Sequence, residues 1–205
     1  MSKPKRADKQ ASGLVVNRRD RCQTPDYGLD PLVPYLKREW VLWESARGEG
    51  YLEHAIKANG FQVVSGDLLT GQNYFLDESL PPAWDAQVTN PPFSLKYKWL
   101  TRAYKLGKPF ALIMPIDVFG SKTAQALFEK HGIEVILFDK RIDYGMPSIG
   151  FEGSSSQFAS AWFTWGLGIG RQLTFSKITK RKQRTMTAII DDAQFGTQQM
   201  TLWVA

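Results

Sequence analysis

The chain has very few of the side chains that cross-link proteins or bind transition metals. Its 205 residues include one cysteine, Cys22, and two histidines, His54 and His131. A single thiol cannot form an intrachain disulfide or build a cysteine-based metal site. The two histidines lie far apart in the sequence, which disfavours a zinc site. We therefore expect a function that needs no bound metal.

Long apolar runs are also missing. No stretch approaches the roughly 20 apolar residues that a membrane-spanning helix needs, and the polar N-terminus lacks the apolar centre of a signal peptide. Hydrophobic residues make up 43% and charged residues 22% of the chain, which is usual for a soluble globular domain. These features predict a soluble, cytoplasmic protein with one folded core and no membrane partner.

Basic residues exceed acidic ones and gather in two segments. The formal net charge is +6, which favours anionic partners such as nucleic acids. One basic segment covers residues 1–20 and the other lies near residues 177–184; a basic pair also follows the apolar run before residue 140. Each of these can equally be a solvated surface without a partner. The candidate nucleic-acid contacts are Lys140, Arg141, Lys180, Arg181, Lys182 and Arg184.

Short apolar runs alternate with segments of helical spacing between residues 40 and 140. Strands are predicted at 41–44, 61–67, 84–89, 108–115, 133–141 and 158–166, with a Pro-Pro turn at 90–93 after the third. Helices are predicted at 51–60, 95–106 and 123–132, after a turn and short helix within 23–39. The alternation predicts an α/β domain at 21–170, with right-handed crossovers and a mostly parallel central sheet covered by helices on both faces. Residues 1–20 then form a flexible basic lead-in. Residues 171–205 form a C-terminal segment with the second basic cluster, either separate from this domain or part of it.

A small-residue loop follows the first predicted strand. The strand ends at Glu44, and the loop contains Ala46, Gly48 and Gly50 before a helix begins. Small residues let the backbone approach a ligand closely, and a helix N-terminus favours negative charge. Asp67 ends the next strand, where an acid can accept hydrogen bonds from ribose hydroxyls. A tight turn and a capping aspartate would explain each feature separately, but together they favour a nucleoside site.

The tetrapeptide from Asn90 to Phe93 follows the third predicted strand. An amino group on an aromatic ring is a poor nucleophile, because its lone pair is delocalised into the ring. Acceptors for its N–H bonds, such as the Asn90 side-chain carbonyl and a backbone carbonyl freed by Pro91 and Pro92, would direct the lone pair toward a methyl donor. Phe93 offers a flat ring for a base to stack on. The alternative is a plain strand-to-helix turn with proline opening the helix.

The segments QTP, WESARGEG and TNPPF, in this order, resemble the S-adenosylmethionine-dependent DNA adenine-N6 methyltransferases. The resemblance is greatest to small enzymes of this type found in phage genomes, and it covers about residues 22–165. It implies a Rossmann-like class I methyltransferase fold, S-adenosyl-L-methionine as cofactor, DNA as partner and, for a phage protein, a location in the host cytoplasm. It places the adenine, flipped out of the duplex, against Asn90, Pro91, Pro92 and Phe93. It assigns the cofactor to Gln23, Thr24, Pro25, Glu44, Ala46, Gly48, Gly50, Asp67, Phe75 and Asn90.

The sequence departs from the family pattern at two places. Family members often carry an acid beside the aromatic residue that corresponds to Phe75, and here Asn73 or Asp77 would have to replace it. The chain also has little room for a target-recognition region, so short loops and the basic cluster near 177–184 would take over that role. RNA adenine, cytosine N4 or a protein glutamine amide could use the same tetrapeptide, although cytosine-N4 enzymes more often carry serine in place of Asn90. A catalytically inactive nucleic-acid-binding protein on this fold is the remaining alternative.

Overall fold

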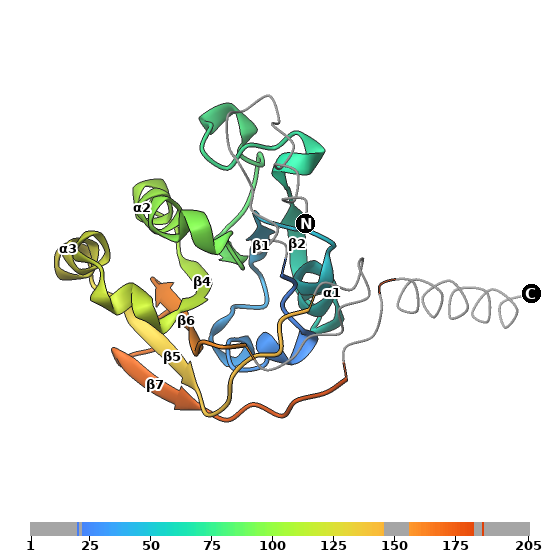
Figure 1. Ribbon diagram of the computed structural model, residues 1–205. Helices are drawn as coiled ribbons and strands as arrows, with labels where there is room; N and C mark the ends of the chain where they lie inside the picture. The colour runs from blue at the N-terminus through green and yellow to red at the C-terminus, as the bar shows by residue number, and fades with distance from the viewer. Residues whose placement is uncertain (1–19, 21, 146–155, 183–185, 187–205) are drawn as a thin grey trace, which may run out of the picture.

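The computed structural model describes residues 20, 22–145, 156–182 and 186 (Figure 1). Residues 1–19 of the basic lead-in and Arg184 lie outside the described residues. The strands are β1 (Val41–Glu44), β2 (Gln62–Ser65), β3 (Ala86–Thr89), β4 (Phe110–Pro115), β5 (Glu134–Phe138), β6 (Ser160–Trp165) and β7 (Leu173–Ser176). The α-helices are α1 (Tyr51–Ala58), α2 (Lys96–Leu106) and α3 (Lys122–His131). Short 3-10 helices are η2 (Asp26–Gly28), η3 (Val33–Tyr35), η4 (Leu68–Thr70), η5 (Asp77–Ser79), η6 (Phe93–Leu95) and η7 (Ile116–Gly120).

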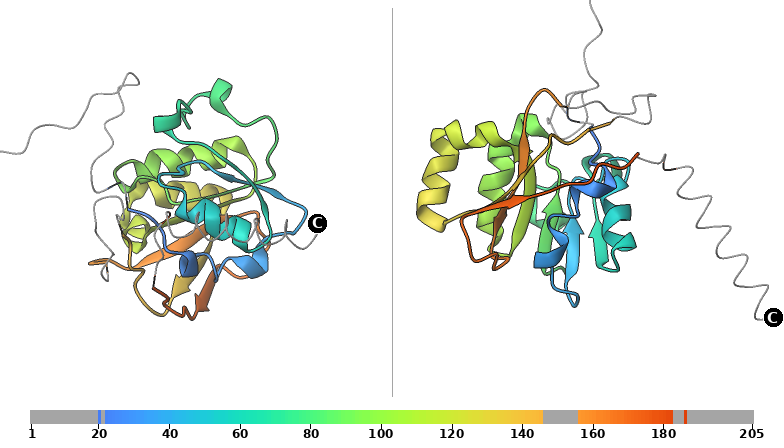
Figure 2. Two further views of the ribbon diagram at one scale, coloured as in Figure 1. Left: turned by 90° about the vertical axis from the view of Figure 1, so that its right-hand side faces the viewer. Right: turned by 90° about the horizontal axis from the view of Figure 1, so that it is seen from below.

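All seven strands form one sheet in the order β2-β1-β3-β4-β6-β5-β7. Strands β2, β1, β3 and β4 run parallel to one another, and so do β5 and β7. Strand β6 lies between β4 and β5 and is antiparallel to both. Helix α1 covers one face of the sheet, and α2 and α3 cover the other (Figure 2). This arrangement is the Rossmann-like class I methyltransferase fold that the sequence predicts.

The strands are apolar on both faces because helices cover both sides of the sheet. Every residue of β4 is buried, and its side chains alternate between two cores. Ile113 belongs to the core beneath α1, while Leu112 and Met114 belong to the core beneath α2 and α3. Trp162 of β6 is fully buried, and its indole N–H donates to the Gly28 carbonyl at 2.8 Å. The segment before β1 is thereby attached to the middle of the sheet.

Three predicted elements differ from those observed. The segment 23–39 contains two 3-10 turns, η2 and η3, in place of one short helix, since three prolines remove backbone donors there. Strand β2 ends at Ser65, so Asp67 lies in the loop that follows the strand. Strand β7 lies within the C-terminal segment, where the sequence predicts no strand, and it pairs with β5 at the edge of the sheet.

Candidate functional site

The order of the strands reverses between β1 and β3. From β1 the chain continues to β2 on one side, while β3 lies on the other side of β1. In sheets of this type, ligands bind in the crevice at the carboxyl ends of the strands, at this switch point. Glu44 ends β1, and Asn90 follows β3 directly. The fold therefore brings two of the predicted site residues to the same position on the sheet edge.

Glu44 is buried at this edge and holds the following loop. One of its carboxylate oxygens, Oε1, accepts hydrogen bonds from the Thr89 hydroxyl and, at 2.9 Å, from the Ala46 backbone N–H. Only 1% of the residue is exposed, and this burial raises its pKa from 4.5 to about 8 against the opposing effect of the two hydrogen bonds. Thr89 was not among the predicted site residues, because its contact with Glu44 depends on the pairing of β1 with β3.

We expect Glu44→Gln to flatten the pH dependence of folding stability between about pH 4.5 and pH 8. Because the pKa is raised in the folded state, the folded protein keeps a proton that the unfolded chain releases in this window. The contribution of Glu44 to the free energy of unfolding is therefore greatest below pH 4.5, and it decreases as the pH rises to about 8. Each pKa unit corresponds to about 1.4 kcal/mol. Denaturant unfolding of both proteins across this range measures the difference, and parallel curves would contradict it.

The loop after Glu44 is fixed by hydrogen bonds from three directions. The Gly48 N–H donates to Asp67 Oδ2 at 3.0 Å, and the Glu49 N–H donates to Gln23 Oε1 at 3.1 Å. The Gly66 N–H donates to the Glu44 carbonyl at 2.9 Å. Gly48 and Gly50 have φ angles of +54° and +89°, which favour glycine. A Cβ atom at Gly48 would lie 2.6 Å from Gln23 Nε2, so the loop and the QTP segment pack closely.

Asn90 contacts the same QTP region from β3. Its side-chain Nδ2 donates to the Cys22 carbonyl at 3.1 Å. Its Oδ1 is buried and has no hydrogen-bond donor among the described residues, and the same holds for the hydroxyl of Thr24. The backbone N–H of Gln23 is bonded to the Gly145 carbonyl at 2.8 Å. Two unpaired polar atoms thus lie around the predicted catalytic turn, and buried polar atoms ordinarily have partners.

The rest of the tetrapeptide forms the turn into α2. Pro91 is buried, and the Pro92 carbonyl accepts the Leu95 N–H at 2.9 Å. The Pro92 carbonyl is thus already bonded and does not match the free backbone acceptor that the sequence predicts at this turn. The half-buried ring of Phe93 meets Tyr144 and Phe158 edge to face, with ring centroids 5.9 Å and 5.5 Å away. An aromatic wall thus borders the turn.

Phe75 lies in an aromatic cluster on the α2 side of the sheet. The rings of Tyr74 and Trp99 stack at 3.7 Å, and Phe75 meets both edge to face. Asn73 Oδ1 accepts the Phe75 N–H at 3.1 Å, whereas Asp77 forms an ion pair with Arg102 at 2.5 Å. Ala46 packs against the same cluster. Phe75 and Ala46 thus pack against the same cluster, whereas Phe75 makes none of the hydrogen bonds that join the loop to Gln23 and Asp67.

The predicted nucleic-acid contacts of the C-terminal segment lie on a strap, residues 177–182, that runs from β7 back toward η2 (Figure 1). Lys180 forms an ion pair with Asp143 at 2.7 Å, and Arg181 pairs with Asp30 at 2.7 Å and Asp26 at 3.4 Å. These charges are compensated within the protein. Lys182 is exposed.

The other predicted pair, Lys140 and Arg141, lies after β5. Lys140 Nζ donates to the Ile178 carbonyl at 3.2 Å, and Arg141 donates to the Ser156 carbonyl at 3.4 Å. Neither contact neutralises the charge by itself, although the Asp139 carboxylate lies 4.0 Å from Lys140. Arg141 is thus an exposed residue beside Ser156, and Lys140 is the one of the pair that contacts the strap.

We expect Arg181→Ala to lower the free energy of unfolding by about 1 kcal/mol or less, because ion pairs between exposed groups are weak. The Arg181 side chain is 45% exposed and that of Asp30 is 37% exposed. Lys182→Ala, which removes a charge with no ion pair among the described residues, serves as the control. Urea unfolding at low and high salt measures both variants. A loss well above 1 kcal/mol for Arg181→Ala would show that the strap is a larger part of the fold.

No protein-family model matches the chain, and neither does any curated protein sequence. Solved structures show remote similarity. One is a protein from Vibrio vulnificus that is assigned as the modification subunit of a type I restriction enzyme. The alignment covers 81% of this chain and 49% of that chain, at 14% identity and a TM-score of 0.45. The chain thus spans about half the length of that protein.

Two further structures align with most of the chain. One is from Pyrococcus horikoshii and is assigned as an RNA methyltransferase; 68% of this chain and 80% of that chain align at 12% identity and a TM-score of 0.43. The other, from Agrobacterium tumefaciens, is predicted to be an O-methyltransferase; 73% of each chain aligns at 15% identity and a TM-score of 0.38. Within the described part of this chain, no group of three or more metal-binding side chains occurs, and no helix is long and apolar enough to span a bilayer.

Proposed function

We propose that the chain is an S-adenosylmethionine-dependent methyltransferase that acts on the N6 amino group of adenine in DNA. One observation carries the proposal. Asn90 is held at the switch point of the sheet by its Nδ2 donor, while its Oδ1 acceptor is buried without a partner. The buried Oδ1 is therefore an available acceptor, and an acceptor is complementary to an amino N–H.

The residues around the loop suit the cofactor. When bound, S-adenosylmethionine supplies a methyl group on a positively charged sulfur. The Asp67 carboxylate lies beside Gly48, where ribose hydroxyls can donate to it. The small residues of the loop leave room for close approach of an adenosine. The unpaired hydroxyl of Thr24 offers a hydrogen bond from the QTP side.

The chemistry required of the protein is orientation. The bond from Asn90 Nδ2 to the Cys22 carbonyl fixes the amide plane, so Oδ1 meets the incoming amino group without reorganisation. An N–H held by Oδ1 directs the nitrogen lone pair away from the ring plane. The Phe93 ring supports the flat base from one side. Positioning of this kind accounts for large rate effects in displacement reactions.

Adenine in DNA is favoured by Asn90, which begins the tetrapeptide from Asn90 to Phe93, and by the net charge of +6. A base inside a duplex must leave the stack to reach Asn90, as in other enzymes that act on bases. The Phe93 ring, bordered by Tyr144 and Phe158, is a suitable surface for such a base.

The test is transfer of tritiated methyl from S-adenosylmethionine into separate pools of DNA, RNA and protein. We expect label in DNA, recovered as N6-methyladenine after digestion. Label in RNA, in cytosine or in protein amides would support methyl transfer but assign it to a different substrate. Absence of label in every pool, together with no binding of the cofactor in calorimetry, would overturn the proposal.

A further inference from the structure

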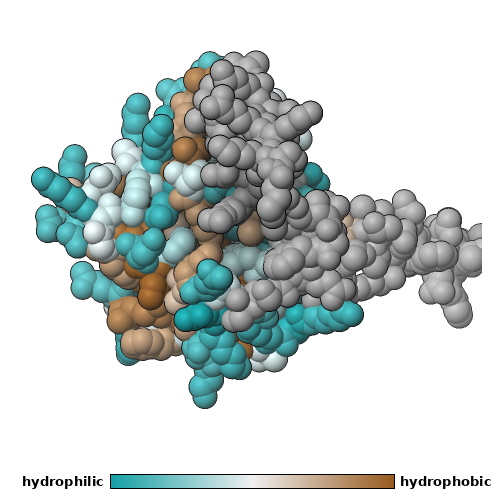
Figure 3. Space-filling view, in the orientation of Figure 1, coloured by the Kyte–Doolittle hydropathy of each residue, from teal (hydrophilic) through white to brown (hydrophobic). Residues whose placement is uncertain are grey.

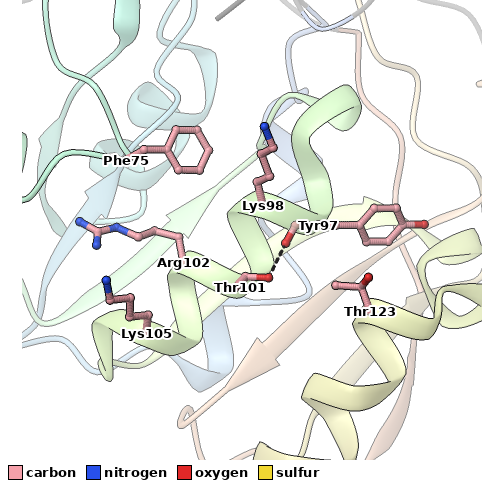
Figure 4. A pocket seen from close by; sticks show the side chains of 7 residues that line it. All are labelled: Phe75, Tyr97, Lys98, Thr101, Arg102, Lys105 and Thr123. Atoms are coloured by element: carbon pink, nitrogen blue, oxygen red, sulfur yellow. Dashed lines mark hydrogen bonds between the residues drawn. The ribbon is translucent and has the colours of Figure 1, made fainter. Parts of the chain in front are cut away.

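An open groove of about 520 Å³ lies along α2, and none of its lining residues belongs to the loop after Glu44. Figure 4 shows its lining, in which Phe75 faces α2 from one side and Thr123 of α3 from the other. The remaining lining residues all come from α2: Tyr97, Lys98, Thr101, Arg102 and Lys105. None of these belongs to the set of hydrogen bonds around Asn90 and Glu44.

Three of these residues form a row of positive charge. Lys98, Arg102 and Lys105 are spaced by four and three residues, which places them on one side of a helix. Their side chains extend from the same side of α2 in Figure 4. At a rise of about 1.5 Å per residue, the row extends over roughly 10 Å. Phosphates of one DNA strand are spaced by about 3.4 Å along the duplex axis, so the row can follow several of them.

Lys98 and Lys105 place two exposed charges in the groove, and Lys105 also helps Arg102 to lower the pKa of the Asp77 carboxyl. Both residues are exposed, and no carboxylate among the described residues lies within salt-bridge distance of either. The aromatic ring of Phe75 is half-buried beside them. A row of exposed cations next to an aromatic ring is the combination that proteins use to hold a nucleic-acid strand.

Arg102 gives the groove a buried cation that can bind an anion. The residue is only 8% exposed, and its Nε is buried without a hydrogen-bond partner among the described residues. Its NH2 group is paired with Asp77 at 2.5 Å, while the Asp77 side chain is 78% exposed. The pair holds the pKa of Asp77 below its usual value. An exposed carboxylate thus occupies the position in which a buried guanidinium would bind an oxyanion of a ligand.

We propose that this groove binds the phosphate backbone of the nucleic acid beside the target base, with Asp77 as the carboxylate that the phosphate displaces from Arg102. The inference rests on the proposed function for the identity of the partner. Helix α2 follows η6, and η6 begins at Phe93. A strand whose base lies at Phe93 therefore reaches Lys98 first and then passes along the groove.

The test compares two double variants with the same change of charge. Lys98→Glu with Lys105→Glu alters the groove, and Lys122→Glu with Lys130→Glu alters exposed residues of α3. Binding of a fluorescent mixed-sequence duplex is measured by anisotropy over a range of salt concentrations. We expect the groove variant to lose at least tenfold more affinity than the control. Its salt dependence should be shallower by about 2, since each lost phosphate contact changes the slope by about 0.9. Equal losses in both variants would overturn the inference.

A third variant tests the displacement step. Asp77→Asn removes the competing carboxylate, and we expect tighter binding of the same duplex, by several fold. Thermal unfolding should shift to a lower temperature, because the buried Arg102 loses its ion pair and keeps only an amide acceptor. Unchanged or weaker binding would overturn the role of Asp77 and Arg102. Because binding is measured without turnover, the two proposals fail separately. If the protein methylates nothing but the groove variant alone loses DNA binding, the groove proposal stands without the proposed function. If the protein methylates DNA but both double variants lose affinity equally, only the groove proposal fails.

Discussion

Asn90→Ala is expected to reduce methyl transfer to DNA by about 10²–10³-fold, the range seen when one preorganised polar group is removed from an active site. The substitution deletes the buried Oδ1 that has no partner and the Nδ2 donor to the Cys22 carbonyl. The substrate amine then loses the acceptor that orients its lone pair. Single-turnover transfer of labelled methyl measures the effect, and calorimetric binding of S-adenosylmethionine shows whether the cofactor site persists.

Asn90→Asp is the matched control for this prediction. Aspartate keeps an acceptor at the position of Oδ1, but it cannot donate to the Cys22 carbonyl. We expect a smaller loss of activity than for alanine, with a stronger dependence on pH. Full activity in Asn90→Ala would refute the assignment of Asn90 as the group that holds the amine. Equal loss of activity and of cofactor binding would instead make Asn90 part of the cofactor site alone.

The second large effect concerns stability. Trp162→Ala is expected to lower the free energy of unfolding by about 3–5 kcal/mol, as for other buried aromatic residues. Trp162 has no exposed surface and packs in the core beneath α1. Its removal leaves a cavity beside η2 and leaves the Gly28 carbonyl without its 2.8 Å indole donor. Guanidinium unfolding followed by circular dichroism measures the change.

Trp162→Phe separates the two contributions. Phenylalanine retains much of the apolar volume and removes the donor to Gly28, so we expect a loss of about 1–3 kcal/mol from an unsatisfied buried acceptor. The difference between the two variants then reports the cavity. Equal losses in both would mean that the hydrogen bond, and not the packing of the ring, attaches the segment before β1 to the sheet.

Local patterns were sufficient to predict the elements whose burial is uniform or strictly periodic. The strand Val41–Glu44 and the helix beginning at Tyr51 agree closely with the predicted ranges, because an apolar run and a glycine-bounded amphipathic segment each have one stable solution. Strand β7 has only four residues, and its alternating apolar side chains face solvent. Leu173 and Phe175 of β7 are exposed, Phe175 to 79%, and apolar surface gathers beside α3 and the β5–β7 edge (Figure 3). Its place in the sheet depends on pairing with β5 and not on its own composition.

The candidate site shows the same division between local and long-range information. The positions of Glu44 and Asn90 at strand ends follow from the sequence, since a turn signal comes after each apolar run. The bond from Thr89 to Glu44 and the pairing of Asn90 with Cys22 connect segments far apart in the chain. The spacing of Lys98, Arg102 and Lys105 was visible in the sequence, but the burial of Arg102 beneath Asp77 required the fold.

The position of β6 has a consequence for the order in which the chain is made. Translation produces β4 and then β5, yet these strands do not pair with each other; β6, made later, lies between them. Until Trp165 leaves the ribosome, one edge of β4 and both edges of β5 are open, and open apolar strands are prone to mispairing. A pause in translation before Ser160 would prolong that vulnerable interval. Truncation at the same point would leave two unconnected parts of a sheet, since the strand that closes it would never be synthesised.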